Sequence, residues 1–319
     1  MTLIEFLPST IGAAACLPAI LLLWLVVIAD RRPEPPLRVL AALLGGVASI
    51  FLARLLRFPF DDIASASGHL PLYVMFGVSI PEETAKISII ALFALNRRLC
   101  DEPMDGAVFG AAVGLGFAAY ENLGYLTGFG EHWLALAVVR NALTVPFHGA
   151  LGVIAGGYLA RLRFGKAIGT PRRSRAANAR LALFAWFIPV VLHTLFDTTL
   201  FSMPVPGSGT RLVLLALAGL VIGGGTTAIA VRQVLKLSRH QKSLRSRAPM
   251  RAWRAVWAFI FAGGFAGFAG AALLARALLN GIAQEWPDAV LGAVLLAAAL
   301  AAFHWSARHL LKATPAAPA

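Results

Sequence analysis

Long apolar stretches constrain the fold of this chain more than any other feature of its sequence. Nine windows are long and apolar enough to cross a bilayer as helices, which takes about 20 residues each. The composition agrees, since 59% of the residues are hydrophobic and only 13% are charged. We therefore predict an all-α, polytopic membrane protein with about nine transmembrane helices. The windows lie near residues 11–29, 38–57, 71–96, 104–127, 133–160, 181–203, 211–231, 254–278 and 287–306.

The basic residues lie mainly in alternate loops between these windows. They concentrate in residues 30–38, 97–102, 161–180 and 232–254 and after residue 306. Because loops rich in Lys and Arg stay on the cytoplasmic side, we predict an N-terminus outside and a cytoplasmic C-terminus. The net charge of +13 then reflects topology and attraction to anionic lipid headgroups, and we expect no nucleic-acid partner.

Two arginines are a mild exception to this pattern. Arg54 and Arg57 precede a loop that the alternation places outside, where Asp61 and Asp62 follow them. Acidic residues count for little in the positive-inside rule. The predicted orientation therefore stands despite these two residues.

The basic segment near residue 235 divides the chain into two parts. Residues 1–235 contain every polar residue inside an apolar window that we single out below. We predict that they form a membrane-embedded core whose site helices span about 71–203. We predict that residues 236–319 form a basic cytoplasmic segment followed by two C-terminal transmembrane helices.

The third window carries three charged residues, Glu82, Glu83 and Lys86. A charge at the centre of a bilayer costs at least about 2.5–3.5 kcal/mol, so residues of this kind usually serve a function. Glu82 and Lys86 are four positions apart and share a helix face, which makes a structural ion pair the simplest alternative. We predict a functional site with further members on neighbouring helices.

The next three windows carry polar residues at a matching depth. Counted from the inner loops at about 1.5 Å per residue, Glu83, His148 and His193 lie roughly 20 Å from the cytoplasmic boundary. Packing alone explains this poorly, because apolar residues of equal size would cost less. We therefore expect these helices to bring their polar side chains together. The polar residues of windows four to six are Glu121, Asn122, Arg140, His148, His193 and Asp197.

Prolines near these residues predict a water-filled cavity among windows three to six. Pro81, Pro146 and Pro189 each remove a backbone hydrogen bond and tend to bend a helix. Inside a bilayer the freed carbonyls are tolerated only where protein or water surrounds them. Glycine rows predict that windows four and five pack closely. These glycines are Gly106, Gly110 and Gly114 in one window and Gly152 and Gly156 in the next.

Carboxylates and imidazoles in a partly dry cavity suit general acid and base chemistry, in which a glutamate activates water to attack a carbonyl. The sequence has no Gly-x-Ser-x-Gly motif and no His-Glu-x-x-His motif, and neither cysteine has a suitable neighbour for nucleophilic catalysis. His148 and His193 could instead bind a metal with Glu121 or Asp197 as third ligand. Asp197 could equally hold the imidazole of His193 in one tautomer.

In their order along the chain, these residues resemble the PrsW family of bacterial intramembrane proteases. That family is related to the CAAX prenyl-endopeptidase and bacteriocin-processing group. The wider CAAX-related pattern has His where Glu121 stands, which favours the PrsW branch. Four motifs within residues 75–200 carry the resemblance: Glu82-Glu83-x-x-Lys86, Phe117-x-x-x-Glu121-Asn122, His148 before a glycine-rich helix, and His193-x-x-x-Asp197.

The resemblance implies a multi-pass protease of the bacterial cytoplasmic (inner) membrane. Its substrate would be a single-span membrane protein, with anti-sigma factors as the known type, first cut near the extracytoplasmic side. Members of the family have been described both as glutamic proteases, which require no cofactor, and as proteases that need a divalent metal such as zinc. The sequence leaves both mechanisms open.

Our expectation is that Glu83 is the general base that activates water and that Glu82 orients this water. His148 and His193 are expected to stabilise the oxyanion and protonate the leaving amine, or to bind a metal. The supporting residues are expected to be Lys86, Glu121, Asn122, Arg140 and Asp197, with Arg140 opposite Glu121.

A function of another class is a proton- or ion-coupled transporter, because transporters also use buried Glu, Lys and His residues. Many such transporters consist of two repeated halves with matching broken helices. Windows seven to nine do not mirror the polar residues of windows three to six. The sequence therefore favours the protease.

Overall fold

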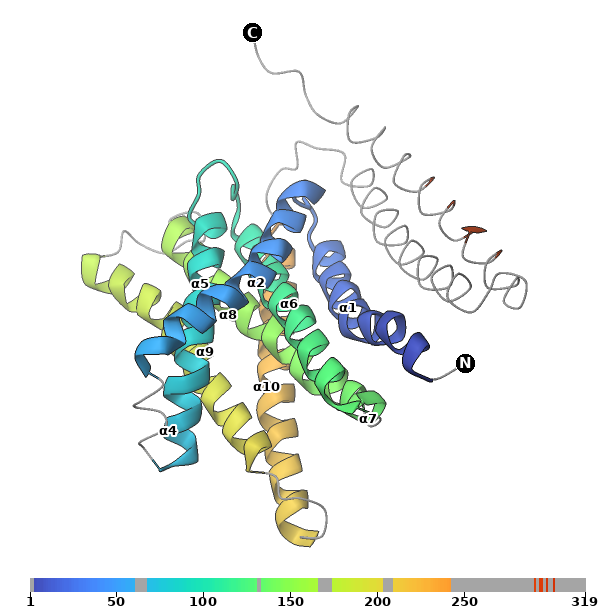
Figure 1. The fold of residues 1–319 in the computed structure, drawn as a ribbon. Helices are drawn as coiled ribbons and strands as arrows, with labels where there is room; N and C mark the ends of the chain where they lie inside the picture. The colour runs from blue at the N-terminus through green and yellow to red at the C-terminus, as the bar shows by residue number, and fades with distance from the viewer. Residues whose placement is uncertain are drawn as a thin grey trace.

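The computed structural model describes residues 3–60, 68–130, 133–165, 174–202 and 209–241, and five isolated positions between 290 and 301. These residues form helices and no strand, as predicted. The long helices pack side by side in one bundle (Figure 1). In chain order the α-helices are α1 (Leu3–Ala29), α2 (Pro36–Arg57), α4 (Leu70–Val74), α5 (Ile80–Ala94), α6 (Pro103–Gly128), α7 (Trp133–Val139), α8 (Val145–Phe164), α9 (Arg175–Phe201) and α10 (Gly209–Gln241).

Five of the described helical stretches are long and apolar enough to cross a membrane. The predicted windows three and four are helical but are not among these five. The former carries three charges, whereas the latter is rich in Gly and Ala. The five stretches are Thr10–Ala29, Pro36–Arg57, Trp133–Phe164, Arg175–Phe201 and Val213–Arg239.

The rest of the predicted topology concerns residues that the structure does not describe. Window eight, and all but isolated positions of window nine, lie outside the described residues. The total of nine helices and the orientation of the termini therefore stay predictions. Helix α10 continues to Gln241, past the predicted boundary at residue 235.

Helix α6 lies inside the bundle and packs against α1, α2, α5 and α8 (Figure 1). Every residue from 102 to 118 is buried. A capping box starts the helix, because Oδ2 of Asp105 accepts a hydrogen bond of 2.9 Å from the backbone N–H of Glu102. Large apolar side chains on α1, α2, α9 and α10 are exposed instead, as expected for helices that face lipid. Neighbouring helices therefore shield α6, which explains why it does not need a strongly apolar sequence.

The glycine rows bring α6 and α8 into backbone contact, which confirms the prediction of close packing. A Cβ atom added at Gly110 would overlap the carbonyl group of Gly152, and one added at Gly152 would overlap that of Gly110. One added at Gly114 would overlap the carbonyl of His148. The spacing of these two helices therefore also sets the position of a candidate site residue.

We expect Gly152→Ala to destabilise the protein by about 1–3 kcal/mol, the usual range for overpacking. The added methyl group has no room beside Gly110 unless the two helices move apart. Thermal unfolding of the purified protein in detergent measures this effect. Gly225→Ala on α10 is the matched control, because among the described residues no atom of another helix lies within 4 Å of its added Cβ. Equal melting temperatures for the two variants would contradict the prediction.

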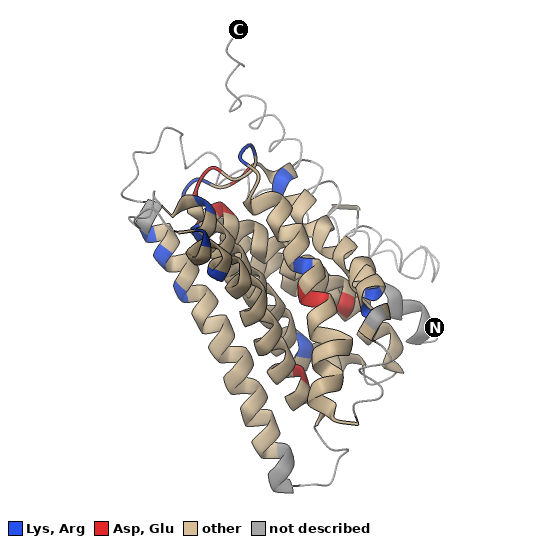
Figure 2. Ribbon diagram, turned by 90° about the vertical axis from the view of Figure 1, so that its left-hand side faces the viewer, with Lys and Arg blue, Asp and Glu red and all other residues tan. Residues whose placement is uncertain are grey.

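Basic side chains gather at one end of the bundle, at the top of Figure 2. Contacts join the segments of this end, since Nε of Arg31 donates a 3.1 Å hydrogen bond to the carbonyl of Ser238 and Arg32 pairs with Glu102 at 3.4 Å. Glu34, which pairs with Arg38 at 3.0 Å, is buried here, and this burial raises its pKa to about 7. The segments at this end are those that the sequence places in the cytoplasm.

Candidate active site

Two π-helical turns precede the helices that carry site residues. The first, Met75–Ser79, leads into α5, and Pro81 is at the second position of that helix. The second, Arg140–Thr144, leads into α8, where Pro146 has the same place. Proline lacks the N–H that an uninterrupted helix would use, and single π turns often occur at functional sites. The irregularities expected at Pro81 and Pro146 are thus present as π turns, whereas α9 continues as an α-helix through Pro189.

Lys86 is the centre of a buried polar network. Its Nζ lies 2.5 Å from Oε1 of Glu83, 3.2 Å from Nδ1 of His148 and 3.7 Å from Oε2 of Glu82. The same nitrogen lies 4.1 Å from the centroid of the Phe117 ring. Glu83, Lys86 and His148 are each 2% exposed. The predicted pair of Glu82 and Lys86 is present, but Glu83 is the closer carboxylate.

His193 has a carboxylate at each of its ring nitrogens. Nδ1 lies 2.8 Å from Oε1 of Glu83, and Nε2 lies 3.2 Å from Oδ2 of Asp197. Nε2 also lies 3.9 Å from Oε2 of Glu82. Such contacts fix the position of an imidazole. The predicted role of Asp197 in holding His193 is therefore consistent with the geometry.

Glu121 and Asn122 are held by Arg140, as predicted for that arginine. Nη2 of Arg140 lies 2.5 Å from Oε2 of Glu121, and its Nε donates a hydrogen bond of 2.5 Å to Oδ1 of Asn122. His148 joins this group to Lys86, because its Nε2 lies 3.3 Å from the same Glu121 oxygen. Arg140 also stacks on Tyr125, 4.0 Å from the ring centroid.

The predicted convergence of four helices is confirmed. All nine candidate residues belong to one connected network of contacts shorter than 4 Å. Helices α5, α6, α8 and α9 and the π turn before α8 supply them. Residues at equal distances from the inner loops meet at one level because straight helices have a constant rise per residue.

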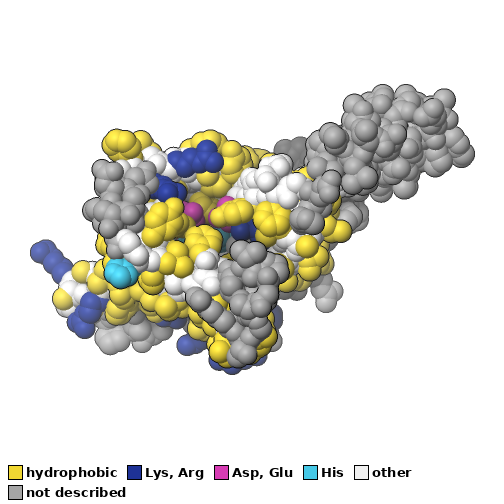
Figure 3. Space-filling view, turned by 60° about the horizontal axis from the view of Figure 1, so that its bottom comes forward, with side chains coloured by type: hydrophobic (Ala, Val, Ile, Leu, Met, Phe, Trp, Pro, Cys, Tyr) yellow, Lys and Arg dark blue, Asp and Glu magenta, His cyan; other side chains and the backbone are white. Residues whose placement is uncertain are grey.

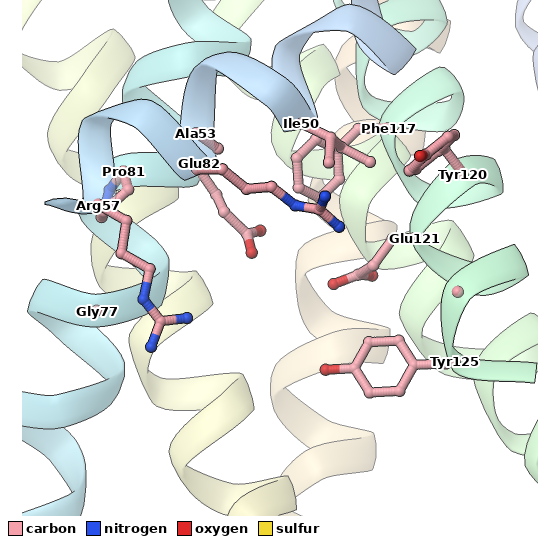
Figure 4. A pocket seen from close by; sticks show the side chains of 12 residues that line it. Ile50, Ala53, Arg57, Gly77, Pro81, Glu82, Phe117, Tyr120, Glu121 and Tyr125 are labelled. Atoms are coloured by element: carbon pink, nitrogen blue, oxygen red, sulfur yellow. The ribbon is translucent and has the colours of Figure 1, made fainter. Parts of the chain in front are cut away.

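A cavity of about 430 Å³ adjoins this network. Glu82 and Glu121 line it, and Figure 4 shows both carboxylates pointing into the same space. Its wall comes from α2, from the π turn before α5 and the first turn of α5, and from α6, near the ends of these helices opposite the basic loops. Figure 3 looks at that end, where acidic side chains are visible in a hollow framed by apolar and basic ones.

The cavity differs from the predicted one in its walls. We expected it among windows three to six, but no residue of α8 or α9 lines it. The space between those two helices is filled by aromatic side chains, since the rings of Phe147 and Phe196 stack with centroids 4.1 Å apart. Glu83, His148 and His193 therefore lie behind the cavity wall, and Glu82 and Glu121 form part of it.

The contribution of α2 to the cavity was not among the predictions from the sequence. Arg54 and Arg57, on the last turn of this helix, line the cavity together with Tyr120 and Tyr125 of α6. The sequence did contain a signal, because these two arginines are the exception to the positive-inside pattern. Without the structure nothing related them to the glutamates.

A family model described as "PrsW family intramembrane metalloprotease" matches residues 34–224 of the chain. The chain belongs to this family. It is 31% identical to Protease PrsW of Bacillus subtilis (strain 168) over 188 residues, which are 58% of this chain and 80% of that protein. It is 30% identical to Protease PrsW of Geobacillus kaustophilus (strain HTA426) over 210 residues, 64% and 86% of the two chains. No solved structure matches.

Membership of the PrsW family decides the general activity. The matched region contains all nine candidate residues and the cavity. The protein is thus a multi-pass membrane protein and an intramembrane protease, and the transporter is not favoured. Both relatives are named as proteases.

The family description names a metal, so the donor set can be tested against one. Among the described residues, Glu83, His148 and His193 each offer a ligand atom, all within 4.8 Å of one another. Glu121 and Asp197, the carboxylates considered from the sequence, are not in this set. Two imidazoles and a carboxylate suit zinc. However, the Lys86 ammonium lies against Glu83 and His148, so the residues as arranged do not fit a metal ion.

Proposed function

We propose that this PrsW-family protease cleaves a membrane-anchored protein by means of water activated by Glu82. The position of the Glu82 carboxylate carries the proposal. It lines the cavity, its Oε2 has no hydrogen-bond partner among the described residues, and Lys86 and His193 approach this oxygen to 3.7 and 3.9 Å. This oxygen is thus a buried, unsatisfied acceptor at the cavity wall, and a water molecule entering from the cavity would supply the missing hydrogen bond.

This proposal exchanges the roles expected for the two adjacent glutamates. Glu83 is 2% exposed and already contacts Lys86 and His193, which leaves little access for water or substrate. The side chain of Glu82 is 18% exposed. Glu83 would then position Lys86 and His193, and Glu82 would act on water.

The reaction proposed for these residues is hydrolysis without a covalent intermediate. Glu82 removes a proton from water as the water oxygen attacks the scissile carbonyl carbon, and it later returns this proton to the leaving amine. The positive charge of Lys86, which lies behind the cavity wall beside Glu82, would stabilise the developing oxyanion electrostatically. His193, with a carboxylate at each ring nitrogen, would hold Glu83 and Asp197 in place. His148 and Glu121 would hold Lys86 and the cavity wall in place.

The same proposal extends to location and substrate. The cavity lies near the helix ends opposite the basic loops, so from the positive-inside rule we expect the cut near the outer surface of the bacterial inner membrane. Anionic lipids would contact the basic end. A single-span anti-sigma factor is the substrate class that we propose from the family resemblance.

Cleavage by the purified protein in liposomes tests this function. We expect a single-span anti-sigma factor to be cut near its outer membrane boundary, with the site located by mass spectrometry. We also expect full activity in protein shown by metal analysis to be metal-free, because Lys86 occupies the place beside the donor atoms. Loss of activity on chelation, restored by zinc, would contradict the proposed mechanism. No cleavage of any membrane protein would contradict the proposed function.

A further inference from the structure

The cavity has a basic rim that the proposed reaction does not use. This rim consists of Arg54 and Arg57, three positions apart on the last turn of α2 and therefore on one face. Figure 4 shows the guanidinium of Arg57 pointing into the cavity, which also contains the carboxylates of Glu82 and Glu121. Arg57 additionally donates a hydrogen bond of 3.2 Å to the hydroxyl of Tyr73.

Arg54 is an exposed arginine on the cavity rim. Among the described residues it has no hydrogen-bond or ion-pair partner. The cavity carboxylates are engaged elsewhere, Glu121 with Arg140 and Glu82 near Lys86. An arginine at the outer end of a transmembrane helix also goes against the positive-inside tendency. A counter-ion that comes with a ligand would account for both features.

The ligand class follows from the chemistry of the cavity. A cation would be repelled by the rim, and a neutral peptide that covered the rim would remove water from Arg54 without pairing its charge. A peptide carboxylate suits a guanidinium, which can bind it through two parallel hydrogen bonds. A substrate carboxylate would also need the positive charge of the guanidinium, because any acid that enters the cavity approaches the negative charges of Glu82 and Glu121.

The size of the cavity limits where this acid lies in a substrate. A sphere of 430 Å³ is about 9 Å across, and an extended chain advances about 3.3 Å per residue. The rim and Glu82 line the same cavity, so about two or three residues separate the groups that contact them. The rim lies at the end of α2 opposite the basic loops, whereas Glu82 follows α4 and a π turn and lies further from that end of the bundle.

We propose that Arg54, assisted by Arg57, is a specificity-determining residue that binds an Asp or Glu side chain of the substrate. This acid lies about two or three residues from the scissile bond, on its extracytoplasmic side. The inference rests on the proposed function, since it names the substrate class of the same cavity.

Single-span test proteins in liposomes provide the experiment. In one series an Asp is placed at successive positions outside the membrane span, and in the matched series an Asn takes its place. We expect wild-type protein to cleave the best Asp protein with a kcat/KM about tenfold or more above its Asn partner, mainly through KM. Arg54→Ala should abolish this ratio, and Arg54→Glu should shift the preference to a Lys at that position. Arg97→Ala, an exposed arginine at the basic end, should keep the ratio.

A binding measurement keeps the inference testable if no protein is cleaved. The affinity of labelled Asp and Asn proteins for the Glu82→Gln variant should differ by the same factor and should become equal when Arg54→Ala is added. Equal kcat/KM values and equal affinities of the wild-type protein for the Asp and Asn proteins would overturn the inference, even where cleavage itself is observed. An effect of Arg54→Ala that depends on the fraction of anionic lipid, and is equal for both series, would overturn it in favour of a lipid headgroup.

Discussion

Glu82→Gln is expected to lower kcat by about 10²–10⁴-fold, the usual contribution of a general base, while the melting temperature stays close to that of the wild-type protein. The amide removes the proton acceptor but keeps the shape of the side chain. Stability should hold because Oε2 of Glu82 accepts no hydrogen bond among the described residues. Cleavage of a single-span substrate in liposomes and thermal unfolding in detergent measure the two effects.

Glu83→Gln is the comparison that separates the two glutamates. Glu83 contacts Lys86 at 2.5 Å and His193 at 2.8 Å, so this variant should lose stability as well as activity. Asp101→Asn, at an exposed position of the opposite end, controls for the loss of a negative charge. Cleavage retained by Glu82→Gln, together with an inactive but fully stable Glu83→Gln, would contradict our assignment and restore Glu83 as the base.

The second large effect is expected from Lys86→Met. This substitution leaves the buried carboxylate of Glu83 without its cation, and breaking a buried ion pair in this way typically costs about 3–5 kcal/mol. We expect a melting temperature about 10 °C lower than in the wild-type protein and no measurable cleavage, because the charge beside Glu82 is also lost. Thermal unfolding in detergent measures the change.

A double variant tests the cause of this loss. Adding Glu83→Gln to Lys86→Met removes both charges of the pair, and neutral replacement of a buried pair is often nearly without cost. The double variant should therefore be more stable than Lys86→Met alone, although still inactive. A double variant less stable than either single variant would show that the charge of Glu83 has another essential partner.

Much of this site could be predicted from the sequence because polar residues inside membrane-spanning segments are rare and usually serve a function. Charged and imidazole side chains within apolar windows are energetically costly, so Glu83, His148 and His193 could be predicted as site residues. Their depth followed from the constant rise of a helix. The backbone contact of α6 and α8 likewise followed from the spacing of their glycines.

The cavity wall could not be predicted in the same way. It depends on α2, whose Arg54 and Arg57 lie far from the glutamates in sequence, and on the stacked rings of Phe147 and Phe196, which close the space between α8 and α9. Periodicity within one helix does not state which other helix packs on which face. That choice is made by the fit of side chains across the whole bundle.

The sequence by itself determined the helical membrane class, the family resemblance and the nine polar residues, because each of these depends on composition, order and local spacing. Only the tertiary structure decided which carboxylate faces the cavity. Glu82 and Glu83 are adjacent, so their side chains point in directions about 100° apart on the helix. Lys86, His148 and His193 surround the face of Glu83, whereas the face of Glu82 borders the space left between α2 and α6.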